Sequence, residues 1–358
     1  MDGQALEEIA RTYCRFRRNG IAHDAGLATG RHRFSFRGFM RHHLLIAVAL
    51  LLPGPLSAQT APAAENMAVS PDAQLAAFFD AVDKAQLARS PQGQSYRGIK
   101  TDQDKWNDNS DSADIAEHAA GQQSLAEMRA RFAKADLNPA SRLSFRLFEK
   151  QMLRRDAGFK YRRNDYVFDQ MNGAQSRYPA FLINIHRIGD VTDARAYVSR
   201  LEKLGVALDQ DIAESEIRAT MGVMPPKWVF PYVISDARNT LKGQPFDAGS
   251  EDSPLLADFK TKVSKLDLPA ADRDALVAAA TTALLTSVKP AYERLIASMN
   301  AQEKRAGNID GIWRLKDGKA YYAANLASYT TTNLSADQIH DLGLAQVARL
   351  QAEMMEIA

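Results

Sequence analysis

Residues 193–221 constrain the fold of this chain more than any other stretch. Apolar side chains recur there on one side of a helix, at Tyr197, Leu201, Leu204, Leu208, Ile212 and Ile217. This spacing predicts an amphipathic helix with one face in a core. No alternating apolar and polar run recurs, and no repeat of fixed period is present. The sequence therefore predicts an all-α fold, an array of long helices.

Further helices are expected on both sides of this segment. Ser70 followed by Pro71 is typical of a helix start, since serine accepts from free amides and proline fits the first turn. Pro290 is expected to kink or break a long helix. Only residues 180–188 have strand character, and the sequence predicts either a short helix or a strand there. The other helices are predicted at 112–134, 139–157, 228–241, 254–266, 269–305 and from about 336 onward.

The N-terminal region has the pattern of an exported protein. A short basic stretch, the apolar run 44–52 and a small-residue exit predict a signal peptide at 40–58. Residues 1–39 are expected to be a non-native upstream extension, with a cytoplasmic arm as the alternative, and 59–71 a linker before a helical domain at 72–358. The apolar run is too short to span a bilayer, so we expect no stable membrane anchor. The expected location is periplasmic or secreted.

Charge and cysteine content exclude several classes of protein. The formal net charge is +2, but residues 1–58 contribute +4, which leaves −2 for the remainder. A slightly acidic body predicts no nucleic-acid partner. The single cysteine, Cys14, excludes an intrachain disulfide. The acidic stretch 101–114 lacks the glycine and closing glutamate of a calcium loop, so we interpret it as a solvated loop and helix cap.

The sequence after residue 58 offers no recognisable catalytic motif. Its three histidines, His118, His186 and His340, are isolated, and none begins the His-Glu-x-x-His pattern of a zinc hydrolase. Nucleophile elbows, phosphate-binding loops and dinucleotide fingerprints are likewise missing from the sequence. We therefore predict no catalytic residue, no metal ligand and no cofactor in this chain.

The region from 311 onward supplies the only candidate groove residues. His340 follows a capping box formed by Ser335 and Gln338 and falls at the edge of an apolar helical stripe. Either it is a boundary histidine hydrogen-bonded to a neighbour, or it lines a substrate groove. Of the adjacent Tyr321 and Tyr322, one is expected to be structural and the other to line a cleft. Thr331 completes the candidate set, although a helix junction is the alternative for that segment.

Several sequence blocks resemble the bacterial domain-of-unknown-function family 885, and the resemblance extends over about 72–358. The blocks are Leu182–His186, Asp193–Leu201, Gly222–Pro226, Gly311–Trp313, Asp317–Tyr322, Thr330–Leu344, Arg349 and Ala352–Met354. This resemblance implies an exported, all-helical protein related to zinc metallopeptidase-like proteins of the HExxH type. In that family the zinc motif lies downstream of the block that contains His340.

The resemblance also implies that this chain is the N-terminal part of such a protein. The last helix runs to Ala358 without the usual capping residues. We expect a chain that lacks the zinc motif and is inactive alone, with zinc and a peptide-like substrate only in complete relatives. Its expected partner is a missing C-terminal catalytic half or a second copy. The apolar stripe of the last helix consists of Ile339, Leu342, Val347, Leu350, Met354 and Ile357. Earlier helices are expected to cover part of this stripe, and the missing half to cover the rest, around Met354 to Ile357. The alternatives are a complete periplasmic binding or scaffold module and one half of a split enzyme.

Overall fold

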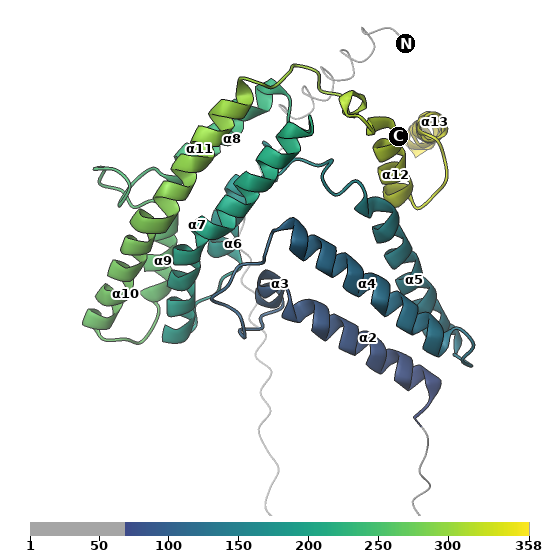
Figure 1. Cartoon of the computed structure of the whole chain (residues 1–358), viewed down its shortest axis with the longest axis horizontal. Helices are drawn as coiled ribbons and strands as arrows, with labels where there is room; N and C mark the ends of the chain where they lie inside the picture. Colours follow the sequence, from purple (N-terminus) through teal and green to yellow (C-terminus); the bar gives the residue numbers. More distant parts are fainter. Residues whose placement is uncertain (1–68, 358) are drawn as a thin grey trace, which may run out of the picture. The chain divides into compact units, whose positions relative to one another are not determined.

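The computed structural model describes residues 69–357, and every regular element in that range is helical (Figure 1). The nearest approach to a sheet within it is one isolated bridge between Gln244 and Asp252. The all-α prediction is therefore confirmed. The predicted upstream extension and signal peptide, and most of the linker, lie outside the described residues. Within 69–357 no helix combines the length and apolarity that crossing a bilayer requires.

Most helices follow the predicted segments, whereas the helices at Pro91–Tyr96 and Gly318–Thr330 were not predicted. Ser70, Ser110, Asn138 and Asp190 each cap a helix by accepting a hydrogen bond from a backbone amide, as such residues do at helix starts. The α-helices are α2 (Pro71–Ala88), α3 (Pro91–Tyr96), α4 (Asp111–Phe132), α5 (Pro139–Phe159), α6 (Ala174–Asn184), α7 (Val191–Thr220), α8 (Phe230–Thr240), α9 (Pro254–Val263), α10 (Ala270–Ala283), α11 (Lys289–Glu303), α12 (Gly318–Thr330) and α13 (Ala336–Ile357).

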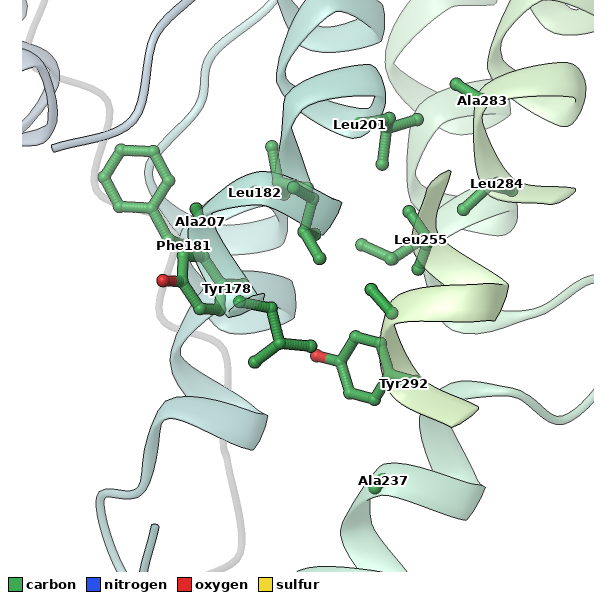
Figure 2. Close-up of a cluster of buried hydrophobic side chains, with 14 of the residues drawn as sticks. Tyr178, Phe181, Leu182, Leu201, Ala207, Ala237, Leu255, Ala283, Leu284 and Tyr292 are labelled. Carbon is green, nitrogen blue, oxygen red and sulfur yellow. The ribbon is translucent and has the colours of Figure 1, made fainter. Parts of the chain in front are cut away.

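A large core forms around α7, which packs against α6, α10 and α11. Its buried side chains come mostly from α6 through α11 and include Tyr197, Leu201, Leu204 and Leu208 of the predicted α7 face. Ile212 of that face is only partly buried, and Ile217 is exposed. Figure 2 shows Leu182, Leu201 and Leu255 turned toward one another from α6, α7 and α9. Tyr292 of α11 is also buried there, and its hydroxyl donates to the backbone oxygen of Gln175 at 2.7 Å.

A second, smaller core joins α2, α4 and α5. Its buried members are Leu75, Phe78, Leu125, Met128, Phe132, Leu137 and Met152. The ring of Phe78 lies 6.0 Å from that of Phe132 and 6.2 Å from that of Phe148, distances typical of aromatic packing. The described range therefore holds two separate apolar clusters.

Two ambiguous segments are resolved by the structure. Residues 180–188 form the end of α6 and the turn after it, not a strand. The long helix predicted at 269–305 is divided by a π-helical turn, Leu284–Val288, and α11 begins again with Pro290 in its first turn. Proline lacks an amide proton and crowds the carbonyl four residues before it, and a widened turn relieves both problems.

One expectation about the last helix is wrong. We expected earlier helices to cover part of the apolar stripe of α13, yet α13 has no buried residue. The chain leaves α12 through Thr331, whose φ of 56° is left-handed, and no helix of the described range comes to lie over the stripe. Ile339 is half-buried, and the other side chains of the stripe are exposed, from 48% at Leu350 to 88% at Ile357.

Candidate functional site

A cavity of about 790 Å³ lies where the start of α4, the segment after α5 and the middle of α7 meet. Charged side chains of both signs line it, and we call it the charged cleft. Its polar lining includes Asp108, Asn109, Asp114, Glu117, Arg162, Asp165, Arg177, Asp211, Glu214 and Arg218. A concave surface with converging polar groups is the usual setting of a binding site.

The floor of the charged cleft is a buried carboxyl group on α7. Asp211 is 5% exposed, and the hydroxyl of Tyr178 donates to its Oδ2 at 2.6 Å. The amide of Asn109 lies 2.9 Å from the Tyr178 hydroxyl and 3.4 Å from Oδ1 of Asp211. Burial raises the pKa of Asp211, and the hydrogen bond from Tyr178 opposes that rise. A carboxyl group with a raised pKa at the base of a cavity is a frequent mark of function.

The walls of the charged cleft are held by paired charges. Arg162 donates to Asp111 from Nε at 2.7 Å, and this contact lowers the pKa of the Asp111 carboxyl. Glu214 accepts from Nε of Arg163 at 2.9 Å and from Nε of Arg218 at 3.0 Å. The basic segment after α5 is thereby fixed between α4 and α7. Since these side chains are only partly exposed, their ion pairs stabilise the shape of the cleft.

Two charged groups of the cleft have no partner within 69–357. The carboxylate of Asp114 makes no hydrogen bond or ion pair there, and neither does the guanidinium of Arg177. Asp114 is exposed, but partial desolvation by its surroundings and then the nearby Asp111 raise the pKa of its carboxyl group. The cleft therefore presents a carboxylate and a guanidinium that are both available to a ligand.

The four residues predicted to line a groove lie on α12, after it and on α13. Tyr321 is half-buried, with its ring 5.5 Å from that of Tyr161, and burial raises its pKa. Asp165, which lines the charged cleft, adds to that rise, so Tyr321 lies near the cleft. Tyr322 is 48% exposed, and Thr331 and His340 are exposed. No hydrogen bond or ring contact within 69–357 joins any two of the four, and the groove built from them stays a prediction.

Candidate metal ligands are dispersed among the residues that the structure describes. In that part of the chain no group of three or more His, Cys, Asp or Glu side chains is arranged to hold one. His118 stacks on Phe159 at 3.9 Å and approaches Asp156 at 3.3 Å, while His186 is buried beside Arg200. Both histidines are thus in contact with other side chains, and the zinc that the family resemblance implies is expected only in complete relatives.

No sequence motif identifies the buried part of the charged cleft, but the position of Asp211 in the helical pattern of α7 does indicate it. Asp211 follows Leu204 and Leu208 at helical spacing, so it falls on the apolar face of α7. Asp193 and Arg200 lie on the same face and are also buried. Charged residues on a core-facing stripe require buried partners, and this indicates a polar network.

Taken together, the fold and the cleft define an all-helical protein with a cavity lined by charges of both signs. Residues 91–358 match a family described as "Bacterial protein of unknown function (DUF885)", and the chain belongs to that family. A crystal structure named "putative lipoprotein from Colwellia psychrerythraea" is similar, with a TM-score of 0.69 and 19% identity. At that identity the likeness shows the fold alone. The match covers 81% of this chain and 51% of the other, so this chain spans about half the length of that structure. No curated protein matches the present chain.

Proposed function

We propose that this chain is an exported helical protein that forms the front, substrate-binding portion of a peptidase-like hydrolase. The charged cleft is the proposed binding site, and the amino end of a peptide-like ligand is the group it recognises. The observation that carries this proposal is Asp114, a carboxylate in a cavity of about 790 Å³ that makes no pair within 69–357. A cavity of this size suits a small organic ligand.

A protonated amine is the group that this end of the cavity fits best. Asp111 and Glu214 raise the pKa of Asp114, and their partners Arg162 and Arg218 lower it, so Asp114 is the carboxylate of this set that has no partner of its own within 69–357. A cation placed beside Asp114 pairs with it and stabilises its ionised carboxylate. Arg177 provides a separate position for a carboxylate of the same ligand.

The proposal assigns binding to this chain and leaves bond cleavage to the complete relatives. The resemblance to zinc peptidase-like proteins supports a hydrolytic role for the whole protein, with the zinc motif downstream. The apolar stripe of α13 is the proposed contact surface for that catalytic part or for a second copy. Export rests on the signal peptide predicted at 40–58.

Calorimetric titration with a tripeptide amide tests the proposal. The free-amine form should bind, and acetylation of its amino end should weaken binding about tenfold or more, the usual effect of losing a charged hydrogen bond. Asp114→Asn should reduce affinity for the free-amine form to a similar extent. The control is Asp80→Asn, an exposed aspartate of α2 that does not line the cleft. Equal affinities for the free and acetylated peptides would contradict the proposal.

The alternative is a complete periplasmic binding or scaffold module. The charged cleft is compatible with it, because recognition of an amine requires no catalytic group. Incubating a full-length relative with the same peptide and analysing the products by mass spectrometry separates the two. Cleavage in the relative favours the hydrolase, whereas binding without cleavage favours the module.

A further inference from the structure

Two more cavities adjoin the charged cleft along α4. One of about 900 Å³ lies between α2, α4 and α5, and another of about 310 Å³ lies between α4 and the end of α5. Gln86 and Glu117 line all three cavities, so the three lie next to one another. We call the two additional cavities together the α4 groove. Asp114 lies where the groove meets the cleft, because it lines both.

The α4 groove has an apolar floor and small residues along one wall. Phe78, Val82 and Phe148 supply apolar surface between α2 and α5. The wall on α2 is formed by Ala77, Ala81 and Ala85, which lie one helical turn apart. Their short side chains project little into the groove. Space therefore remains for the side chains of a ligand.

Three glutamines in the α4 groove favour a peptide over a lipid as its occupant. Gln86, Gln123 and Gln151 line the groove with exposed side chains, and their amide groups form no hydrogen bond within 69–357. A side-chain amide offers two donors and an acceptor, which match the alternating N–H and C=O groups of an extended backbone. An alkyl chain would leave these amides without partners.

The groove also has the length of a short peptide. From Asp114 to Glu127 the α4 wall advances about 20 Å, at about 1.5 Å per residue. An extended chain covers about 3.3 Å per residue, so about six residues fit along it.

We infer that the charged cleft and the α4 groove form one surface for an extended peptide. Its free amino end lies at Asp114, and apolar side chains from the third residue onward occupy the groove between α2 and α5. This inference rests on the proposed function and adds the substrate class, which is peptides with a free amino end followed by apolar residues.

The test titrates the whole chain with two hexapeptide amides. Both have free amino ends, and they carry either leucine or serine at the third and fifth positions. Burial of two leucine side chains should make the leucine peptide bind at least about tenfold more tightly. Ala77→Phe and Ala81→Phe, which fill the groove from exposed positions, should remove this preference. The matched control is Ala76→Phe, on the neighbouring exposed position that does not line the groove.

Each outcome bears on one of the two proposals. Equal affinity for both peptides, or equal effects of Ala77→Phe and Ala76→Phe, overturns the groove inference and leaves amine recognition by Asp114 standing. Displacement of the leucine peptide by laurate, with no penalty for acetylating the amino end, overturns it in favour of an amphiphile site. Failure of both peptides to bind overturns the proposed function as well. Thermal unfolding followed by circular dichroism confirms that all three variants fold.

Discussion

At the scale of single residues, the buried guanidinium of Arg200 determines the state of a histidine. Arg200 is fully buried and has no carboxylate partner within 69–357. It donates to the backbone oxygen of Lys105 at 3.0 Å and to Oγ of Ser95 at 2.9 Å. Its Nη1 lies 3.0 Å from Nδ1 of His186. Because arginine only donates, Nδ1 must accept, and the single imidazole proton lies on Nε2, 3.1 Å from the backbone oxygen of Asp193.

This arrangement predicts that the chain loses stability as the pH falls below about 6.5. Burial, followed by the Arg200 charge, lowers the pKa of His186 to about 4. Between that value and the ordinary histidine pKa of about 6.5, the unfolded chain binds a proton that the folded chain does not. The stabilisation is complete above about pH 6.5 and is lost on the way down to about 4. At pH 5 the loss should reach about 2 kcal/mol.

Urea unfolding at pH 7 and pH 5 measures this effect. His186→Gln cannot titrate, so its free energy of unfolding should change much less between the two pH values. His118→Gln is the matched control, since His118 is a histidine of the same chain on α4. An unchanged pH dependence in His186→Gln would show that other groups cause the loss.

Local contacts of single residues could be predicted from the sequence, whereas distant ones could not. The capping box is confirmed, since the amide of Gln338 donates to Ser335 Oγ at 3.2 Å and Gln338 Oε1 accepts from the Ser335 amide at 2.9 Å. Its members are three residues apart, so the helix itself brings them together. Tyr178 and Asp211 are 33 residues apart, and only the packing of α6 on α7 makes them neighbours.

At the scale of secondary-structure elements, α13 differs from every other long helix of the described range. Its 22 residues include none that is buried, although one side of it carries a continuous apolar stripe. The capping box and the ion pair of Arg349 with Glu353 support the helix from within. Such local contacts contribute only tenths of a kcal/mol to about 1 kcal/mol each. Helical periodicity in the sequence predicted this element, but no periodicity reveals whether a partner covers it.

The isolated chain is expected to self-associate through α13. Sedimentation at micromolar concentrations should detect oligomers, because an exposed apolar stripe gains free energy when a second copy covers it. Replacing both Met354 and Ile357 with serine should weaken this association. Met355→Ser is the control, because Met355 is 77% exposed but lies off the stripe. A chain that stays monomeric, with slowly exchanging amides in α13, would contradict this prediction.

At the scale of the described chain, two apolar cores are joined by polar contacts. Lys100 donates to Asp193 at 2.7 Å, and Trp106 donates to the backbone oxygen of Arg200 at 2.8 Å. Both contacts tie the segment between α3 and α4 to α7. The charged cleft lies between elements of both cores, since α4 belongs to the smaller core and α7 to the larger. The sequence predicted the helices of each core, but this division depends on which apolar faces meet.

The two cores are expected to lose their structure separately when each is weakened. Met128 of the smaller core and Leu204 of the larger core are both 0% exposed, so truncation of either to alanine should cost about 2–5 kcal/mol. Hydrogen exchange followed by mass spectrometry resolves where that loss falls. Met128→Ala should accelerate exchange in α2, α4 and α5 and leave α7 and α11 protected. Leu204→Ala should accelerate exchange in α7 and α11, because these helices share its core. Within 69–357 the two apolar clusters share no buried residue. The junction between them consists of polar contacts and of the rings of Tyr96 and Trp106 on Phe181, and such a small junction breaks locally at lower cost than a shared apolar core. If each variant instead accelerates exchange equally in both sets of helices, the polar contacts couple the cores into one cooperative unit.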